Sequence, residues 1–525
     1  MLRLSSARLP SARLPSARLR SARLRRAAVA VLATASSVAA LAAPQALAAP
    51  APSQGSAHYV DCAAGSDAAA GTTPGAAWRT LGKASAAAYR PGDRILFKRG
   101  TTCTGTFAPT ASGAAGAPLA AGAYGGGAKP RIAGAGARAA ILLDNVQYWE
   151  LRDLDVTNTG PLATTTDRRA GVLVRLHDYG IGHHYLVDGV DVHAVNGADF
   201  KDPDPSGGIL FVVQGSARPT RFAEVTVRHA TVAHTDRTGI GTSSTWGRRP
   251  EHPQGPGTSF APITGLSLHD NSVRDVGGDG IVVQNAVGAR VDHNRVDGFN
   301  RRSAGYNAGV WAWNSDRVRY QFNEVSGGHG TRDSMAYDID GGNNGNVYQY
   351  NYSHDNEGGF LLICNGEGMT SDRNTVRYNL SLNDRNTAAP YGVVSVVCAA
   401  ATRTLVHNNT IATGAPHTAM VSSNGPGGVT FRNNVLAGAE AGSPISDPHN
   451  VYDHNLYARI PHLPDGDTAG VGADPRFVAP GDLRLRADSP ALGAGVRVPD
   501  SGARDFYGNP VPDPPNIGAY QGRGQ

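Results

Sequence analysis

Short apolar stretches alternate with polar turn residues in a repeating pattern along the second half of the chain. An asparagine stands at the centre of each unit, between an aromatic or polar residue and the start of an apolar run. These asparagines are Asn271, Asn294, Asn323, Asn351, Asn379, Asn409, Asn434 and Asn455. Successive asparagines are between 21 and 30 residues apart. A period of this length indicates a solenoid rather than a set of globular domains.

A second apolar run follows most of these asparagines and is entered through glycine or another small residue. Examples are GDGIVVQN, NAGVWAWN, DSMAYDID, GGFLLICN and YGVVSVVC. Helical periodicity is hard to find here, and turn-forming residues bound each run. Units with two or three short strands fit one coil of a right-handed parallel β-helix, in which stacked coils bury each other's apolar side chains. We therefore expect an all-β fold of this type.

The repeated asparagines are expected to have a structural role. Asparagine tolerates the left-handed backbone conformation that tight turns require. Equivalent asparagines on stacked coils can also hydrogen-bond to one another through their amides. The sequence therefore predicts a ladder of asparagines along one corner of the solenoid, with Asn271 and Asn455 near its ends.

The N-terminus has the features of a secretory signal peptide. Residues 1–26 contain eight arginines and no acidic residue, and an alanine-rich apolar run leads to Ala46-Leu47-Ala48. A charged region, an apolar region and a small-x-small site define such a peptide. We expect residues 1–48 to be the signal peptide and 49–57 a linker, so that the mature protein is secreted, extracellular and monomeric, with no membrane segment.

Removing this leader changes the charge balance. The chain has 48 basic and 43 acidic residues, and without the eight leader arginines the balance is 40 − 43 = −3. A nucleic-acid partner requires a basic patch on the folded part of the chain. Composition therefore argues against nucleic acid as a partner.

The mature chain divides into three parts on sequence pattern. Residues 58–134 are expected to form the N-terminal cap and first coils, with a helix near Leu81–Ala88 covering the open end. Residues 135–460 are expected to form the parallel β-helix. Residues 461–525 are rich in proline and are expected to form an irregular closing segment.

The chain has four cysteines, Cys62, Cys103, Cys364 and Cys398. An even number in an exported chain indicates two disulfides, for which three pairings are possible. We favour Cys62–Cys103 and Cys364–Cys398, because each joins neighbouring segments. None of the four has the spacing of a metal site.

Both ends of the mature chain resemble a known superfamily. The opening block Asp61–Gly100, with Trp78–Leu81 and Pro91–Asp93, is similar to the start of bacterial pectate-lyase-like β-helix proteins. Leu483–Gly495 and Asn516–Tyr520 are similar to their ends. The resemblance implies the fold. The superfamily includes polysaccharide lyases, glycoside hydrolases, uronan epimerases and members without known catalysis, so the resemblance does not select an activity.

The candidate catalytic residues are carboxylates within residues 299–373. Asp338 and Asp340 are two residues apart on a predicted strand and therefore share a face. Burying both in the apolar interior would be costly, so we expect that face to point outward. Asp333 stands at the entrance to the strand. Paired carboxylates are the groups that glycoside hydrolysis needs, and their separation sets retention or inversion.

The next coil and a loop add further candidates. Glu357 is a fourth candidate catalytic carboxylate, and Glu367 lies in a following loop. The candidate substrate-binding residues combine aromatic and basic side chains: Trp311, Trp313, Tyr337, His354, Arg332 and Arg373. Trp246, in the glycine- and proline-rich insertion 241–262, is placed to close over the same groove.

Other readings of this cluster stay open. Single acids in β-helix turns often accept amide hydrogen bonds or bind structural calcium. A lyase or epimerase needs a base, usually lysine or arginine, and a group that neutralises the uronate. The cluster contains no lysine, but Arg332 or Arg373 could act as base and Asp338 with Asp340 could hold calcium.

We expect a secreted enzyme that cleaves glycosidic bonds of a polysaccharide. The carboxylates favour a glycoside hydrolase, which requires no cofactor, over a calcium-assisted lyase or epimerase. The third alternative is a non-catalytic glycan-binding protein, in which the tryptophans would matter and the carboxylates would not.

Overall fold

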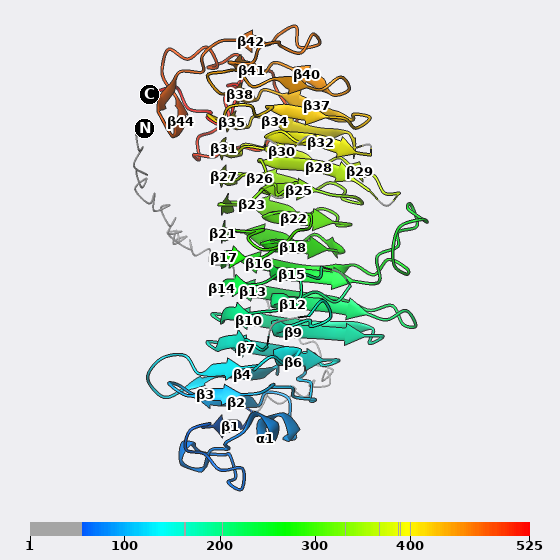
Figure 1. Cartoon of the computed structure of the whole chain (residues 1–525), viewed down its shortest axis with the longest axis vertical. Coiled ribbons are helices and arrows are strands. Elements are labelled where there is room, and N and C mark those ends of the chain that lie inside the picture. The colour runs from blue at the N-terminus through cyan, green and yellow to red at the C-terminus, as the bar shows by residue number, and fades with distance from the viewer. Residues whose placement is uncertain are drawn as a thin grey trace, which may run out of the picture. The chain divides into compact units, whose positions relative to one another are not determined.

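The computed structural model forms a right-handed parallel β-helix (Figure 1), as the sequence predicts. It describes residues 55–161, 164–201, 203–330, 332–366, 368–386, 388, 390–399 and 401–525. The predicted signal peptide 1–48, most of the linker and Glu367 lie outside the described residues. Three long sheets run along the solenoid, and neighbouring strands in each come from successive coils and pair in parallel.

The first sheet begins at the N-terminal end of the solenoid. Its strands, in spatial order, are β1 (Ala57–Val60), β2 (Arg94–Lys98), β4 (Leu119–Tyr124), β7 (Trp149–Arg152), β10 (Ile181–Asp188), β13 (Arg221–Arg228), β16 (Ile263–His269), β20 (Arg290–Asp292), β23 (Arg319–Gln321), β26 (Val347–Gln349), β30 (Thr375–Arg377), β34 (Thr404–His407), β37 (Val429–Arg432) and β40 (Val451–Asp453). The short β19 (Ala286–Val287) pairs with β16.

The second sheet follows the first after a tight turn in each coil. Its strands are β3 (Thr102–Thr104), β5 (Arg131–Ala133), β8 (Asp155–Asn158), β11 (Asp191–Val195), β14 (Thr231–Thr235), β17 (Ser272–Val276), β21 (Arg295–Asp297), β24 (Glu324–Ser326), β27 (Tyr352–His354), β31 (Leu380–Leu382), β35 (Thr410–Ala412), β38 (Val435–Ala437), β41 (Leu456–Ala458) and β42 (Val471–Gly472).

The third sheet contains the apolar runs that follow the asparagines. Its strands are β6 (Ala139–Asp144), β9 (Ala170–His177), β12 (Gly207–Gln214), β15 (Thr238–Ser244), β18 (Ile281–Gln284), β22 (Val310–Trp313), β25 (Tyr337–Ile339), β28 (Leu361–Asn365), β32 (Val394–Cys398), β36 (Val421–Ser423) and β39 (Ile445–Ser446). Two small pairs lie outside these sheets, β29 (Ser371–Asp372) with β33 (Ala401–Thr402) and β43 (Phe477–Ala479) with β44 (Asp482–Leu485).

The predicted asparagine ladder is present at the turn between the first and second sheets. Asn323 Nδ2 donates to Asn351 Oδ1 over 3.0 Å, and the same contact recurs from Asn271 to Asn455. The left-handed residue, however, is the one before each asparagine, such as Phe322 with φ of 55° and Tyr350 with φ of 57°. The preceding residue makes the bend because the asparagine side chain is directed inward to bond neighbouring coils.

The N-terminal end carries the predicted helix, α1 (Leu81–Ala86), beside β1 (Figure 1). Its Leu81 and Ala84 are buried, and the Thr80 hydroxyl accepts the N–H of Lys83 at the helix start. A single 3₁₀ turn, η1 (Pro74–Ala76), precedes it.

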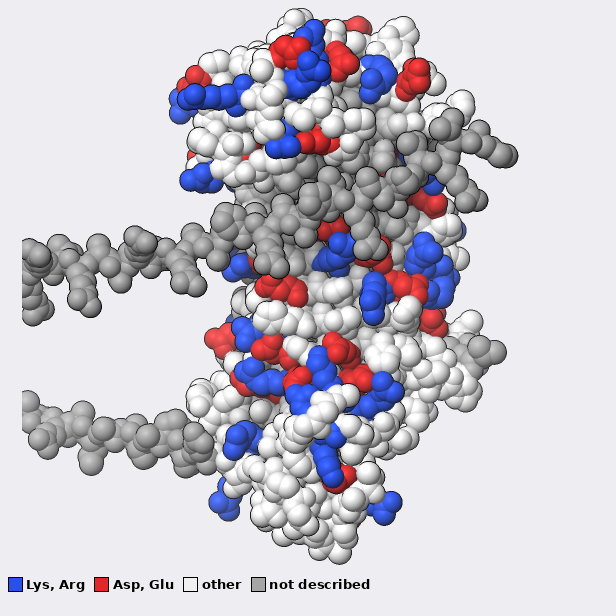
Figure 2. Space-filling view, turned by 90° about the vertical axis from the view of Figure 1, so that its left-hand side faces the viewer, with Lys and Arg blue, Asp and Glu red and all other residues white. Residues whose placement is uncertain are grey.

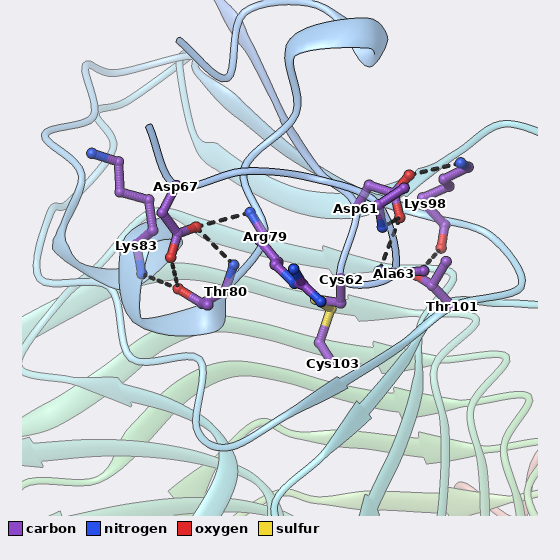
Figure 3. The surroundings of a disulfide bond; sticks show 11 residues. Asp61, Cys62, Ala63, Asp67, Arg79, Thr80, Lys83, Lys98, Thr101 and Cys103 are labelled. Carbon is purple, nitrogen blue, oxygen red and sulfur yellow. Dashed lines mark hydrogen bonds and ion pairs between the residues drawn. A yellow bond between two sulfur atoms is a disulfide. The ribbon is translucent and has the colours of Figure 1, made fainter. Parts of the chain in front are cut away.

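Both predicted disulfides are formed, Cys62–Cys103 and Cys364–Cys398. The first joins the loop after β1 to β3 (Figure 3), where the Lys98 ammonium also binds Asp61 at 2.7 Å. The second links β28 to β32 in the third sheet. Cross-links between successive coils limit how far those coils can separate in the unfolded chain.

The C-terminal segment folds back along the second sheet. The backbone N–H of Ala519 donates to Thr410 Oγ1 over 2.9 Å, and Asn408 Nδ2 donates to the Asn516 carbonyl over 2.9 Å. Leu483 and Ala519 are buried together with Leu380. This segment therefore covers apolar side chains on the outside of the last coils.

Two surface features bear on function. On the face seen in Figure 2, basic and acidic side chains are interspersed and form no extended basic patch. Among the described residues, no helix is long and apolar enough to cross a membrane.

Candidate functional site

The outer face of the third sheet carries the predicted carboxylates. Strand β25 places Tyr337 and Ile339 in the solenoid core, so the alternation of side chains turns Asp338 outward. Asp338 lies in register between Trp311 on the preceding coil and Leu362 on the following coil. Asp340 follows β25 by one residue.

Two loops from distant parts of the chain form a roof over this face. The loop 196–206 leads into β12, and the loop 298–309 leads into β22. The Ser303 hydroxyl donates to both carboxylate oxygens of Asp199, at 2.9 and 2.8 Å. The Lys201 ammonium donates to the Tyr306 carbonyl over 3.1 Å. The roof explains why Asp338 is only 5% exposed although it points away from the core.

A cavity of about 400 Å³ opens beside the carboxylates. Its lining joins the third sheet, the roof and the insertion that follows β15: Lys201, Pro203, Ser243, Ser244, Thr245, Pro256, Gly257, Gln284, Trp311, Trp313 and Asp340. Among the predicted catalytic residues, Asp340 therefore reaches the cavity. The volume is within the range of sites for small organic ligands.

Asp279 organises the wall of this cavity and is completely buried. Its Oδ1 accepts the Trp311 indole N–H over 3.0 Å, and its Oδ2 accepts a guanidinium N–H of Arg237 over 3.0 Å. The Lys201 ammonium is 3.7 Å from Oδ2. Asp279 thus holds an aromatic ring and two cations in fixed positions.

Sequence reasoning missed Asp279 and Lys201. Asp279 stands in GDGIVVQN at the entrance to a third-sheet strand, so the repeat itself carried a signal for it. Lys201 lies in a loop without periodicity, 139 residues before Asp340 in sequence. The expectation that the cluster contains no lysine is therefore wrong, because a loop from an earlier coil delivers one.

The two tryptophans have different surroundings. Trp311 is 4% exposed, and the Lys201 ammonium lies 4.2 Å from the centre of its ring, a cation–π contact. One face of Trp311 is therefore occupied. Trp313 is half-buried and lines the same cavity, which leaves it better placed to stack on a ligand.

The insertion after β15 closes one side of the cavity. Trp246 within it is buried and packs in the main apolar core rather than among the residues that line the cavity, so its predicted closure over the groove is wrong. The Arg249 guanidinium binds both carboxylate oxygens of Asp316 at 2.9 Å and donates to the Asn314 carbonyl at 3.0 Å. These bonds fix the insertion to the coil that carries the tryptophans.

Burial changes the acidity of two carboxyls. It raises the pKa of Asp338 well above the ordinary value, and the neighbouring charges of Asp340 and Asp333 raise it further. Burial also raises the pKa of Asp333, although backbone N–H groups of Ser334 and Asn307 donate to its Oδ1 and oppose the shift. The Oδ1 of Asp338 is buried and has no hydrogen-bond partner among the described residues.

Several predicted site residues lie elsewhere. Tyr337 faces the core, where its hydroxyl donates to the Asn323 carbonyl over 3.0 Å, because neighbours on a strand point to opposite sides. Its predicted contact with substrate is therefore wrong. His354 is on the second sheet and binds Asp355 and Glu324, at 2.8 and 3.3 Å.

Glu357 and Arg373 are also outside the cavity. Glu357 lies in the connection between β27 and β28, where it binds His329 at 2.7 Å and Arg385 at 3.0 Å. Arg373 is exposed and pairs with Asp372 at 3.1 Å. Arg332 remains at the edge of the site, 4.7 Å from the centre of the Tyr306 ring.

In the described part of the chain, no three histidine, cysteine, aspartate or glutamate side chains form a group that could hold a metal ion. Calcium binding by Asp338 and Asp340 stays a prediction.

The fold is a right-handed parallel β-helix, and it carries an outward-facing carboxylate on its third sheet. No family model matches the chain. It is similar to a lacto-N-biosidase from Bifidobacterium longum subsp. longum, with 26% identity over 598 aligned positions that cover 89% of this chain and 36% of that protein. The chain thus spans about a third of the length of this curated relative.

Solved structures share the fold. A GH136 lacto-N-biosidase from Eubacterium ramulus superposes with a TM-score of 0.59 at 24% identity, covering 72% of this chain and 67% of that chain. A complex of XylC with xylose superposes with a TM-score of 0.52 at 11% identity, covering 89% and 98%. At these identities the likeness establishes the architecture.

Proposed function

We propose that this protein is a glycoside hydrolase that releases a short unit, of the lacto-N-biose type, from the end of an oligosaccharide. The observation that carries the proposal is the grouping of three carboxyls, in which the charges of Asp333 and Asp340 both act on the outward-facing Asp338 and Asp340 lines the cavity together with Trp313. The likeness to lacto-N-biosidase supports the choice of substrate class.

Asp340 is assigned as the carboxylate that acts at the anomeric carbon. Its side chain lines the cavity, and its Oδ1 accepts the N–H of Gly341 over 2.7 Å, which fixes the orientation of the carboxyl group. It either attacks the anomeric carbon or removes a proton from the attacking water. The configuration of the released sugar distinguishes these two routes.

Asp333 is assigned as the general acid. Burial raises the pKa of Asp333 above that of an ordinary aspartate and so favours its protonated form, which is the form that protonates the leaving oxygen. Both backbone N–H groups donate to Oδ1, so Oδ2 is left to carry that proton to the substrate. As the glycosidic bond breaks, the leaving oxygen takes the proton from Asp333.

Asp338 is assigned a positioning role between the other two carboxyls. It shares an outer face with Asp340, but its Oδ1 is sealed from solvent and from hydrogen-bond partners among the described residues. A protonated Asp338 beside Asp340 lowers the repulsion that two adjacent carboxylates would otherwise suffer.

The roof explains why a chain end would be preferred over the middle of a polysaccharide. Loops 196–206 and 298–309 are joined above the sheet by the Ser303–Asp199 and Lys201–Tyr306 hydrogen bonds. The insertion closes a further side through Pro256 and Gly257. A cavity bounded in this way accepts a terminal unit and excludes a long chain on that side.

The test is to incubate the mature protein with an oligosaccharide that ends in a lacto-N-biosyl unit, and with neutral and uronic polysaccharides. Release of the free disaccharide, lost in Asp340→Asn and Asp333→Asn, is the expected result. Asp144→Asn, which alters an exposed ion pair with Arg175 on earlier coils of the same sheet, is the matched control. Absence of cleavage of every substrate by the wild-type protein would overturn the proposal.

A second candidate function is favoured by Lys201. A lyase uses a basic side chain to remove the proton next to a uronate carboxylate, and Lys201 brings an amine into the cavity. Cleavage of a uronic polysaccharide with formation of an ultraviolet-absorbing unsaturated product would favour elimination over hydrolysis.

A further inference from the structure

We infer that Tyr391 and Tyr306 form a second sugar-binding subsite, on the opposite side of Asp333 and Asp338 from the cavity, which holds the leaving group of the substrate. The inference rests on the proposed hydrolase function and deepens it. It assigns a neutral sugar ring as the ligand of this subsite.

Tyr391 lies in the segment that leads into β32, two coils after β25. Its ring packs on the outward cluster of Met335, Leu362 and Val397. Leu362 is the register partner of Asp338, so the Tyr391 ring contacts the coil directly next to that carboxyl. The cavity with Trp313 lies toward the preceding coils.

Hydrogen bonds tie the segment before Tyr391 to the backbone next to Asp333. Asn386 Nδ2 donates to the Asp333 carbonyl over 3.2 Å and to the Gly358 carbonyl over 2.8 Å. The Tyr391 N–H donates to Ala388 over 2.8 Å. Burial, followed by the charge of Asp333, raises the pKa of Tyr391 to about 12, so its hydroxyl stays protonated and able to donate.

Tyr306 supplies the second ring from the roof. It is 53% exposed, one of the few large aromatic side chains of the described residues that face solvent. The Arg332 guanidinium lies 4.7 Å from the centre of its ring and donates to the Ala304 carbonyl over 3.1 Å. The guanidinium therefore covers one face of Tyr306 and limits how the ring can turn.

The chemistry of these groups suits a sugar rather than an ion. Aromatic rings stack on the C–H faces of pyranoses, while a tyrosine hydroxyl and guanidinium N–H groups donate to sugar hydroxyls. Asp333 is close to both rings, because its charge acts on Tyr391 and its Oδ1 accepts the N–H of Asn307, the residue after Tyr306. A general acid must stand where the two subsites meet. Trp313 and Asp340 hold the unit on one side of that bond, and the tyrosines hold the unit on the other.

The experiment compares two substrates with the same lacto-N-biosyl unit. One has a sugar as leaving group, and the other is the lacto-N-biosyl fluoride, whose small leaving group fills no subsite. Tyr391→Ala and Tyr306→Ala are expected to lower kcat/KM for the oligosaccharide by about 3- to 10-fold each. They should leave the fluoride within about 2-fold of the wild-type value.

Control variants separate binding from folding. Tyr391→Phe keeps the ring and is expected to retain most of the activity on the oligosaccharide. Phe322→Ala removes a partly exposed ring on a distant corner and should change neither substrate. Equal losses on both substrates in the tyrosine variants would overturn the inference. Failure of the wild-type protein to cleave either substrate would instead overturn the proposed function.

Discussion

The indole N–H of Trp311 donates to Oδ1 of Asp279 over 3.0 Å. Both side chains are buried, although they lie on the outer face of the solenoid. Asp279 belongs to the coil before Trp311, so the bond crosses from one coil to the next. Through Oδ2 the same carboxylate binds Arg237 and approaches Lys201. Asp279 therefore holds the wall of the cavity in place although it does not itself line the cavity.

Replacing Asp279 should therefore affect both activity and stability. In Asp279→Ala the guanidinium of Arg237 loses a buried partner, and removing one member of a buried pair costs about 3–5 kcal/mol. We expect a lower midpoint in thermal unfolding and a kcat/KM lower by at least about 10-fold, because Trp311 and Lys201 lose their anchor. A variant with unchanged unfolding and unchanged kinetics would contradict this account of the wall.

The proposed roles of Asp333 as general acid and Asp340 as the carboxylate at the anomeric carbon predict different responses to the leaving group. Asp333→Asn should lower kcat/KM for an oligosaccharide by about 10²–10⁴-fold, the usual contribution of a general acid. It should retain much more activity on a glycosyl fluoride, which departs without protonation. Asp340→Asn should lose activity on both substrates. The paired kinetic measurements would assign the roles in reverse if Asp340→Asn alone were rescued by the fluoride.

The raised pKa of Asp338 predicts the sign of a pH effect on stability. A carboxyl with a folded pKa above its unfolded value keeps more protons in the folded state, so stability falls as pH rises above the unfolded pKa. Asp338→Asn removes this ionisation while keeping the shape of the side chain. We expect its melting temperature to exceed that of the wild type at pH 8 and the difference to shrink at pH 4. A difference that grew toward acid pH would have the wrong sign.

His354 should have a pH effect in a different window. Hydrogen bonds and charge from Asp355 and Glu324 outweigh its burial and raise its pKa to about 9. The protonated form therefore contributes stability that is full below about pH 6.5 and is lost as pH rises through about 9. Chemical denaturation at pH 6 and pH 9.5 should show a smaller pH dependence in His354→Gln than in the wild type.

The Cys364–Cys398 disulfide is expected to matter for the coil next to the carboxylates. It closes a segment with a sequence separation of 34 residues. A loop of this size corresponds to about 3–4 kcal/mol of stabilisation in the chain-entropy description. The double variant Cys364→Ser/Cys398→Ser should therefore unfold at lower denaturant concentration. The single-pair variant Cys62→Ser/Cys103→Ser gives a comparison at the other end of the solenoid.

The β-helix architecture and the outward direction of the carboxylates could be predicted from the sequence. The spacing of asparagines such as Asn323 and Asn351 defined the coil, because each coil must present the same turn to its neighbours. The two-residue spacing of Asp338 and Asp340 placed them on one outward face, because strand side chains alternate. Of the three possible cysteine pairings, the sequence favoured the one that forms, because each of its disulfides joins neighbouring segments.

The residues that surround those carboxylates could not be predicted from the sequence, because they come from distant loops. Lys201 reaches them from a loop with no periodicity, and the burial of Asp338 depends on contacts between loops 196–206 and 298–309. Periodicity reports the face on which a side chain lies, but it does not report which distant loop covers that face. The pKa of a carboxyl depends on how far neighbouring segments bury it. The proposed assignment of the acid and of the second carboxylate therefore required the folded structure.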